Sequence, residues 1–307
     1  MPNYIVIKKK IKNFDKKISV SGDKSISIRW VLFSSIASGI SKAQNLLMSE
    51  DVSAALEAIR KLGIKVIIKK NTCKIYGKGI NGFKFNKNLT INAKNSGTLG
   101  RLILGLLVNS DKKIKLIGDS SLSKRDFKRI TDPLSKFGPT FKLSKNKHLP
   151  LTIKGVDITK PIYHYEDKGS AQVKSSIILA ALKTPGTTII KAKKSRNHTE
   201  ILCKHLGLPI KVKNYDKFDL IKINRAKKIR TLNYNIPSDI SSSAFFIILT
   251  SLAKSSKLLI KNVNINSSRT GAIEILKMMG VKIIFRNKRI YKGEPIADIL
   301  VNSPKKI

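Results

Sequence analysis

The stretch Ser21–Arg29 (SGDKSISIR) gathers residues whose types and spacing suit the binding of an anion. Asp23 is a good N-cap residue, so a helix is expected to begin at Lys24. Ser25 and Arg29 are four residues apart and share one face of this helix, close to its free N–H groups and its positive end. An ammonium, a guanidinium and free N–H groups at one helix start favour a phosphate or a carboxylate. The alternative is a capped helix with two solvated basic residues.

A second helix start presents a different set of groups. The turn Asn95–Thr98 precedes an apolar run, and Gly97 within it would let a ligand approach the backbone. Arg101 follows one turn further on, and the later segment Gly118–Asp126 adds Arg125. This start also favours an anion, although a small polar helix start standing alone is usually only a cap.

A third helix start offers Ser170 and Gln172, which are neutral hydrogen-bonding groups, with Lys174 behind them. Taken with the first two, it predicts a site for at least one multiply charged anion and for an uncharged body that carries hydroxyl groups.

These helix starts recur because the chain repeats one unit four times: a helix, a strand, a second helix ended by glycine, and another strand. The units open near residues 21, 95, 169 and 238, and their helix-ending glycines are Gly63, Gly138, Gly207 and Gly280. The first helix is apolar on most sides and is expected to be buried. Two runs before it, YIVI and KKISV, are expected to form strands. Units of this length are small α/β subdomains rather than solenoid repeats, so we predict an internally repeated α/β protein whose helix N-termini converge.

The formal net charge of +42 invites a nucleic-acid-binding interpretation. However, only 11 of the 61 basic residues are arginine, and the lysines are spread through nearly every segment with few aromatic residues between them. Base and phosphate recognition favours arginine. We therefore expect no nucleic-acid partner, but a positive field that attracts anionic substrates.

The remaining composition predicts a cytoplasmic protein without cofactor or metal. Cys73 and Cys203 lack CxxC spacing and are expected to be reduced, and the four histidines show no metal-ligand spacing. No apolar segment reaches the length of a membrane span, so no membrane association is expected. We expect a monomer.

Seven stretches, in order along the whole chain, together resemble the 5-enolpyruvylshikimate-3-phosphate (EPSP) synthase family, in the form typical of its second sequence class. They are SGDKSISIR (21–29), NSGTLGR (95–101), GDSSLSKRD (118–126), LPLTIKG (149–155), KGSAQVKS (168–175), SRNHTE (195–200) and PSDISSSAFF (237–246). The resemblance implies the inside-out α/β barrel of the enolpyruvyl transferase type, with repeated helix–strand subdomains in two domains. Residues 21–235 would form a complete three-repeat substrate-binding domain, and residues 1–20 with 236–307 part of a second domain.

The reaction that the resemblance implies is transfer of the enolpyruvyl group of phosphoenolpyruvate to the 5-hydroxyl of shikimate 3-phosphate, with release of phosphate, on the route to chorismate and aromatic amino acids. Lys24 would touch both substrates and contribute to catalysis. The resemblance assigns shikimate 3-phosphate to Lys24, Ser25, Arg29, Ser170, Ala171, Gln172 and Arg196. It assigns phosphoenolpyruvate to Lys24, Gly97, Arg125 and Gln172, and it gives Arg101 no role beyond structure or field.

The sequence departs from the family in length. Family members continue past the segment 293–303 (GEPIADILVNS) into regions that supply a catalytic Asp and a Glu, Lys and Arg, none of which is in this chain. We therefore expect a C-terminally truncated, inactive fragment with an incomplete second domain. Three alternatives remain: the sister transferase acting on UDP-N-acetylglucosamine, a basic nucleic-acid-binding repeat protein, and a catalytically inactive paralogue with a binding role. Against the first, neither Cys73 nor Cys203 lies in a Gly-flanked loop suited to a catalytic thiol.

Overall fold

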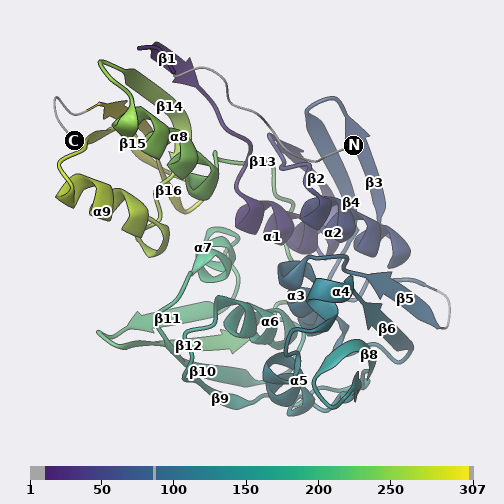
Figure 1. Ribbon diagram of the computed structural model, residues 1–307. Helices are drawn as coiled ribbons and strands as arrows, with labels where there is room; N and C mark the ends of the chain where they lie inside the picture. Colours follow the sequence, from purple (N-terminus) through teal and green to yellow (C-terminus); the bar gives the residue numbers. More distant parts are fainter. Residues whose placement is uncertain (1–10, 86–87, 304–307) are drawn as a thin grey trace. The chain divides into compact units, whose positions relative to one another are not determined.

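Four small β-sheets of one topology make up the β-structure in the residues that the computed structural model describes, which are 11–85 and 88–303. These sheets fall into two units (Figure 1). The larger unit is Gly22–Ile236. The smaller unit comprises Met1–Ser21 with Pro237–Ile307, and the structure describes residues 11–21 and 237–303 of it. The role of the units as functional domains stays a prediction.

Each of the three sheets of the larger unit has four strands, of which one edge strand runs parallel to its neighbour and the others are antiparallel. In order across each sheet, the strands are β13 (Tyr234–Asn235), β2 (Ser38–Gln44), β4 (Thr72–Lys78) and β3 (Lys65–Lys69); β5 (Leu89–Asn92), β6 (Lys113–Ile117), β8 (His148–Lys154) and β7 (Thr140–Ser144); and β9 (Tyr163–Glu166), β10 (Thr187–Lys193), β12 (Phe218–Asn224) and β11 (Ile210–Asn214).

The helices of the larger unit repeat with the sheets. They are α1 (Lys24–Ser35), α2 (Glu50–Lys61), α3 (Gly97–Leu107), the short α4 (Ser120–Ser123), α5 (Lys128–Ser135), α6 (Ala171–Ala181) and α7 (His198–His205). The first helices of the three copies, α1, α3 and α6, are buried along almost their whole length, α3 packs on both α1 and α6, and α7 packs on both α1 and α6. The burial predicted for the first helix is confirmed.

The ends of these helices follow from local sequence. The carboxylate of Asp23 accepts a hydrogen bond from the Ile26 N–H, as an N-cap should. The four predicted helix-ending glycines all have positive φ, between +68° and +118°. Glycine adopts this left-handed conformation without strain, and it commonly follows the last helical turn. At Gly63 there is a second reason, because an added Cβ would lie 2.2 Å from the carbonyl oxygen of Lys84.

The smaller unit contains one copy of the same sheet, formed by β1 (Asp15–Ile18), β14 (Lys257–Asn264), β16 (Glu294–Asn302) and β15 (Lys282–Tyr291), in that order. Its helices are α8 (Ile240–Leu252), α9 (Gly271–Met278) and the 3₁₀ turn η1 (Ser267–Arg269). Ile247 and Ile273, one from each α-helix, pack on a core that includes Ile260, Ile299 and Val301 of the sheet.

In both units the first sheet takes its parallel edge strand from a distant part of the chain. Tyr234 pairs with Ala43, so the end of the larger unit completes its first sheet. Asp15 pairs with Lys257, so the start of the chain completes the sheet of the smaller unit. The two chain crossings therefore lie at 21/22 and 236/237.

The predicted α/β class and the fourfold repeat are confirmed. Three details differ from the sequence prediction or fall outside it. No closed barrel forms among the described residues, whose sheets are open. The sequence alone also favours Glu50 and Asp51 as the caps of the second helix, but the residue before α2 is Ser49, and both acidic residues lie in the first turn of the helix. The YIVI run falls outside the described residues.

Candidate functional site

The N-terminus of α6 is held by a buried carboxylate. Glu166, at the end of β9, accepts hydrogen bonds from the N–H of Ser170 at 2.6 Å and of Lys168 at 3.3 Å. The hydroxyl of Ser170 caps the helix by accepting from the Val173 N–H. Ala171, the first helical residue, is half-buried. This turn fixes the start of α6, where free N–H groups and the positive helix end favour an anion.

Gln172 ties this helix start to that of α3. Its side-chain oxygen accepts a hydrogen bond from the Arg101 guanidinium, and its side-chain nitrogen donates to the Thr98 hydroxyl at 3.1 Å. Two of the three helix starts that the sequence predicted to converge are therefore joined directly.

Three guanidinium groups gather at this junction. A Cβ added to Gly97 would lie 3.1 Å from Nη1 of Arg125 and 3.3 Å from Nη1 of Arg101, so glycine leaves room for both. Burial and the neighbouring Arg129 and Arg125 lower the pKa of Arg101 to about 10, although the charge of Asp126 raises it. Arg125 is exposed and donates to the side-chain oxygen of Asn95 at 2.9 Å. So dense a positive charge is an attractive site for a phosphate or carboxylate.

Arg129 was missed by sequence reasoning. It lies in the first turn of α5 and donates a hydrogen bond to the Ser170 hydroxyl. Arg101, which the sequence left as a structural or field residue, lies against the Phe127 ring, 5.4 Å from its centroid, and orients Gln172. The only signal for Arg129 was a second arginine four residues after Arg125.

Lys24 is the accessible cation at the start of α1. Its side chain is 49% exposed, and its ammonium lies 3.6 Å from the carboxylate of Asp51 in α2. Ser25 beside it is half-buried. A half-exposed ion pair of this length is weak, so it leaves the ammonium able to contact a ligand.

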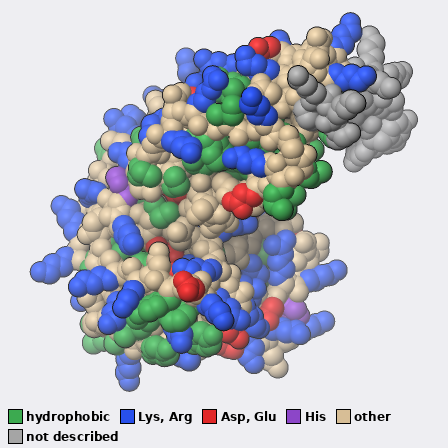
Figure 2. All heavy atoms as spheres, turned by 90° about the vertical axis from the view of Figure 1, so that its left-hand side faces the viewer, with side chains coloured by type: hydrophobic (Ala, Val, Ile, Leu, Met, Phe, Trp, Pro, Cys, Tyr) green, Lys and Arg blue, Asp and Glu red, His purple; other side chains and the backbone are tan. Residues whose placement is uncertain are grey.

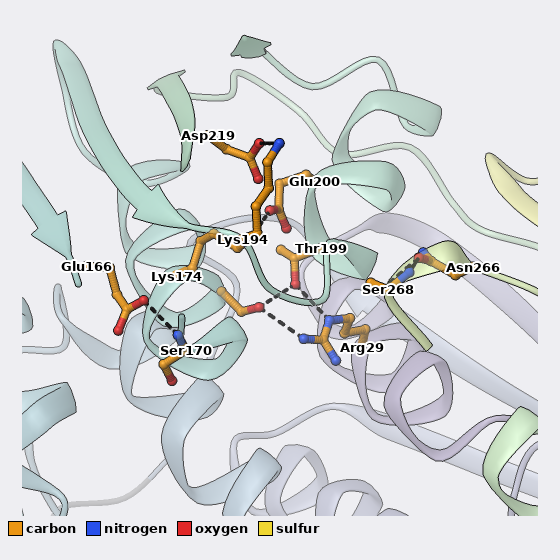
Figure 3. A network of polar contacts seen from close by, with 11 residues as sticks. Arg29, Glu166, Ser170, Lys174, Lys194, Thr199, Glu200, Asp219, Asn266 and Ser268 are labelled. Atoms are coloured by element: carbon orange, nitrogen blue, oxygen red, sulfur yellow. Dashed lines mark hydrogen bonds and ion pairs between the residues drawn. The ribbon is translucent and has the colours of Figure 1, made fainter. Parts of the chain in front are cut away.

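Arg29 is placed differently, because its side chain turns into the protein (Figure 3). The residue is 3% exposed. Its Nε donates to the Thr199 hydroxyl at 2.7 Å and its Nη2 to the Ser175 hydroxyl at 3.0 Å, while Nη1 donates to the backbone carbonyl of Ser25 at 3.0 Å. Arg29 thus links α1 to α6 and α7.

Lys174, which the sequence placed behind Ser170 and Gln172, is fully buried. Its ammonium lies 2.6 Å from the carboxylate of Glu200 in the first turn of α7. It is therefore an internal ion-pair partner rather than a group that faces a ligand. Arg196 is exposed in the turn just before α7.

Comparison with known proteins now decides the family. The family model described as EPSP synthase (3-phosphoshikimate 1-carboxyvinyltransferase) matches residues 8–305. The chain belongs to the EPSP synthase family.

Individual relatives support this family assignment. The chain is 40% identical to a 3-phosphoshikimate 1-carboxyvinyltransferase of Petrotoga mobilis, over 95% of this chain and 67% of the relative. It is 37% identical to one of Hydrogenovibrio crunogenus, over 94% and 65% of the two chains. A solved EPSP synthase structure from Acinetobacter baumannii aligns with a TM-score of 0.86 at 36% identity, covering 95% of this chain and 65% of that one. The chain thus spans about two thirds of the length of these relatives.

The two cysteines of this EPSP synthase family chain are buried. Burial raises the pKa of Cys73 to about 11, and the pKa of Cys203 also lies well above its usual value, because of burial first and the charge of Glu200 second. Neither has the lowered pKa of an activated thiol. A cavity of about 410 Å³ is lined by Cys73 and residues such as Gln44 and Asn235, but by none of the predicted site residues.

The described part of this family member contains no group of three or more His, Cys, Asp or Glu side chains that could hold a metal ion. Within the same residues, no helix is long and apolar enough to cross a membrane. On the face drawn in Figure 2, lysine and arginine side chains are scattered widely rather than gathered into one stripe.

Proposed function

We propose that this chain binds shikimate 3-phosphate and phosphoenolpyruvate and takes part in enolpyruvyl transfer between them. The observation that carries the proposal is the junction of α3, α5 and α6. Here Arg101 and Arg129 contact Gln172 and Ser170 at the capped N-terminus of α6, and Arg125 lies beside Gly97 at the start of α3. Two anionic substrates can be brought together only where positive charge is concentrated and fixed in place.

The proposed contacts follow the family pattern. Shikimate 3-phosphate lies against Lys24, Ser25, Arg29, Ser170, Ala171, Gln172 and Arg196, and phosphoenolpyruvate lies against Lys24, Gly97, Arg125 and Gln172. Because Arg29 is buried, it acts on the ligand mainly through its fixed charge and by holding Ser25. Arg129 joins this set, because it already donates to the hydroxyl of Ser170.

In the reaction proposed, the 5-hydroxyl oxygen gives up its proton and adds to C2 of phosphoenolpyruvate while C3 takes up a proton, which gives a tetrahedral ketal. The ketal then loses phosphate from C2 and a proton from C3, which leaves the enolpyruvyl ether. The residues of this chain bind and orient: the half-exposed ammonium of Lys24 can contact both anions, and the arginine cluster offsets the charge of the departing phosphate.

We also propose a cytoplasmic, monomeric protein with no cofactor. Two buried cysteines that form no disulfide are in keeping with a reducing compartment.

The test is calorimetric titration of the 307-residue chain with shikimate 3-phosphate, followed by phosphoenolpyruvate. We expect saturable binding of the first ligand. In Gln172→Ala its affinity should fall by at least about tenfold, because that change removes the amide group held between Arg101 and Thr98. Asp15→Asn, an exposed change in the smaller unit, serves as the control.

Three results would overturn the proposal. They are absence of saturable binding of shikimate 3-phosphate, saturable binding of UDP-N-acetylglucosamine in its place, or steeply salt-dependent duplex DNA binding that survives Lys24→Ala. A phosphate-release assay on the same chain separates binding from turnover: release would show that the chain carries out the transfer by itself, and would contradict the inactivity expected from the sequence.

A further inference from the structure

Helices α6 and α7 are joined by two adjacent polar contacts (Figure 3). One is the ion pair between Lys174 and Glu200, with 2.6 Å between the ammonium nitrogen and a carboxylate oxygen. The other lies one residue along each helix, where the hydroxyls of Ser175 and Thr199 are 2.7 Å apart. A charged and a neutral contact therefore fix the position of α7 along α6.

The neutral contact also holds Arg29. Its guanidinium donates to Thr199 at 2.7 Å and to Ser175 at 3.0 Å, so the hydroxyls that orient it are chain neighbours of the two charged residues. Both charges act on the same buried thiol, because Glu200 raises and Arg29 lowers the pKa of Cys203. A shift of α7 along α6 would therefore move the acceptors of Arg29.

Stability alone does not explain the ion pair. Lys174 is fully buried and Glu200 is 3% exposed. Among the described residues, no donor makes a well-directed hydrogen bond to either oxygen of Glu200, so the approach of Lys174 is its one close polar contact. Removing two charges from water costs several kcal/mol each, and a well-packed apolar pair in the same place is often as stable or more so. What an apolar pair lacks is a fixed geometry.

We propose that Lys174 and Glu200 are positioning residues that set the affinity of this site for shikimate 3-phosphate. They lock the first turn of α7 onto α6, and thereby hold Thr199 and Ser175 where these orient Arg29. The first turn of α7 begins just after Arg196, so the placement of this turn affects the position of Arg196 as well as that of Arg29. This inference rests on the proposed function.

The decisive variant is the double substitution Lys174→Met with Glu200→Leu, which removes both charges and keeps the volume. We expect it to fold with an unfolding midpoint at or above that of the unaltered chain. We expect its dissociation constant for shikimate 3-phosphate, measured by calorimetry, to rise about tenfold. A pair that only stabilised the fold would leave the affinity of the folded protein unchanged.

The matched control is Lys257→Met with Asp15→Leu, which removes an exposed ion pair of the smaller unit and the same two charges. It should leave the affinity within about twofold, since exposed pairs contribute little. Equal losses in the two double variants would mean that the loss of any ion pair, not the position of this one, lowers the affinity, and would overturn the inference.

A second variant keeps the test decisive if the first fails to fold. Glu200→Asp retains the charge but withdraws the carboxylate by one methylene, and it should weaken binding severalfold. Thr199→Val tests whether the ion pair acts through Arg29. Added to the double variant, it should reduce the affinity for shikimate 3-phosphate much less than it does in the unaltered chain, because both changes release Arg29. Unchanged affinity in the folded variants, or fully additive losses, would refute the positioning role. If the unaltered chain binds no shikimate 3-phosphate, the proposed function fails first.

Discussion

The two units use the same sheet topology but bury their first helices to very different extents. Counted from the capping residues Asp23 and Asp239, Ile36 and Leu252 occupy the same position: Ile36 directly follows α1, and Leu252 is the last residue of α8. Ile36 is fully buried, whereas Leu252 is 65% exposed.

The difference lies in the neighbours. In the larger unit, α3 covers faces of both α1 and α6, and these helices come from successive copies. The described residues of the smaller unit contain one copy, and α8 packs on its own sheet and on α9. The exposed side of α8 carries large apolar side chains, namely Phe245, Phe246, Ile248, Leu249 and Leu252. Burial of these helices is therefore a property of the set of copies rather than of one copy.

The largest expected difference between the units concerns their ion pairs. Glu200→Gln in the larger unit leaves the ammonium of Lys174 buried without a counter-charge, and should lower the free energy of unfolding by about 3–5 kcal/mol. Asp15→Asn in the smaller unit breaks the ion pair with Lys257, whose two side chains are 49% and 69% exposed. This change should alter the free energy of unfolding by at most about 1 kcal/mol.

Denaturant unfolding measures both changes. The single tryptophan, Trp30, is fully buried in the larger unit and donates from its indole to the Leu232 carbonyl, so its fluorescence follows that unit. Far-ultraviolet circular dichroism follows both units. A loss below about 1 kcal/mol in Glu200→Gln would mean that Lys174 finds water or another partner.

The next comparison replaces leucine by alanine in each unit. Leu32 of α1 is fully buried, so Leu32→Ala should cost about 2–5 kcal/mol from lost burial and the cavity left behind. Leu252→Ala removes a side chain that is already largely in water, and should change stability by less than about 0.5 kcal/mol. The same unfolding experiment measures both. A large cost for Leu252→Ala would show that α8 is covered in solution.

The smallest expected effect concerns pH. Burial lowers the pKa of Lys183 to about 8, while its ammonium donates to the Leu106 carbonyl at the end of α3. Between pH 8 and 9 the unfolded chain keeps this proton and the folded chain loses it, so the larger unit should gain about 1 kcal/mol of stability as the pH rises.

Trp30 fluorescence at a series of pH values measures this gain, and Lys183→Met should abolish it. The raised pKa values of Cys73 and Cys203 act in the opposite direction from about pH 8 upward, because the unfolded thiols ionise first. The contribution of Lys183 is therefore the difference between the profiles of the unaltered chain and of Lys183→Met. Identical profiles of the two proteins between pH 8 and 9 would show that Lys183 stays charged when folded.

Much of the fold could be predicted because its signals are local. N-cap residues such as Asp23 and Ser170 and the glycines after the second helices act within a few residues, so their spacing revealed the repeat. The pairing of strands that are distant in sequence, such as that of Tyr234 with Ala43, could not be predicted, because a strand of two residues such as β13 shows almost no sequence pattern. The central strands β4, β8, β12 and β16 were likewise not recognised as parts of the unit.

The candidate site divides in the same way. Residue types and spacing predicted that Lys24, Gly97, Ser170 and Gln172 stand at helix starts, and they do. Arg125, which the sequence placed in a later segment, lies between α4 and α5 with its guanidinium beside Gly97. Sequence could not assign partners, because Arg29 and Thr199 are 170 residues apart and either could equally face water.

The sequence by itself determined the α/β class, the repeat and the helix starts that carry the basic and hydroxyl groups, because capping and apolar periodicity depend only on near neighbours. Only the tertiary structure decided which of the charged groups stay accessible. Lys24 remains half-exposed at 49%, whereas Arg29 and Lys174, on equally polar stretches of sequence, are buried. The physical reason is that the cost of burying a charge is met by partners on other helices, and the position of these partners depends on how the helices pack.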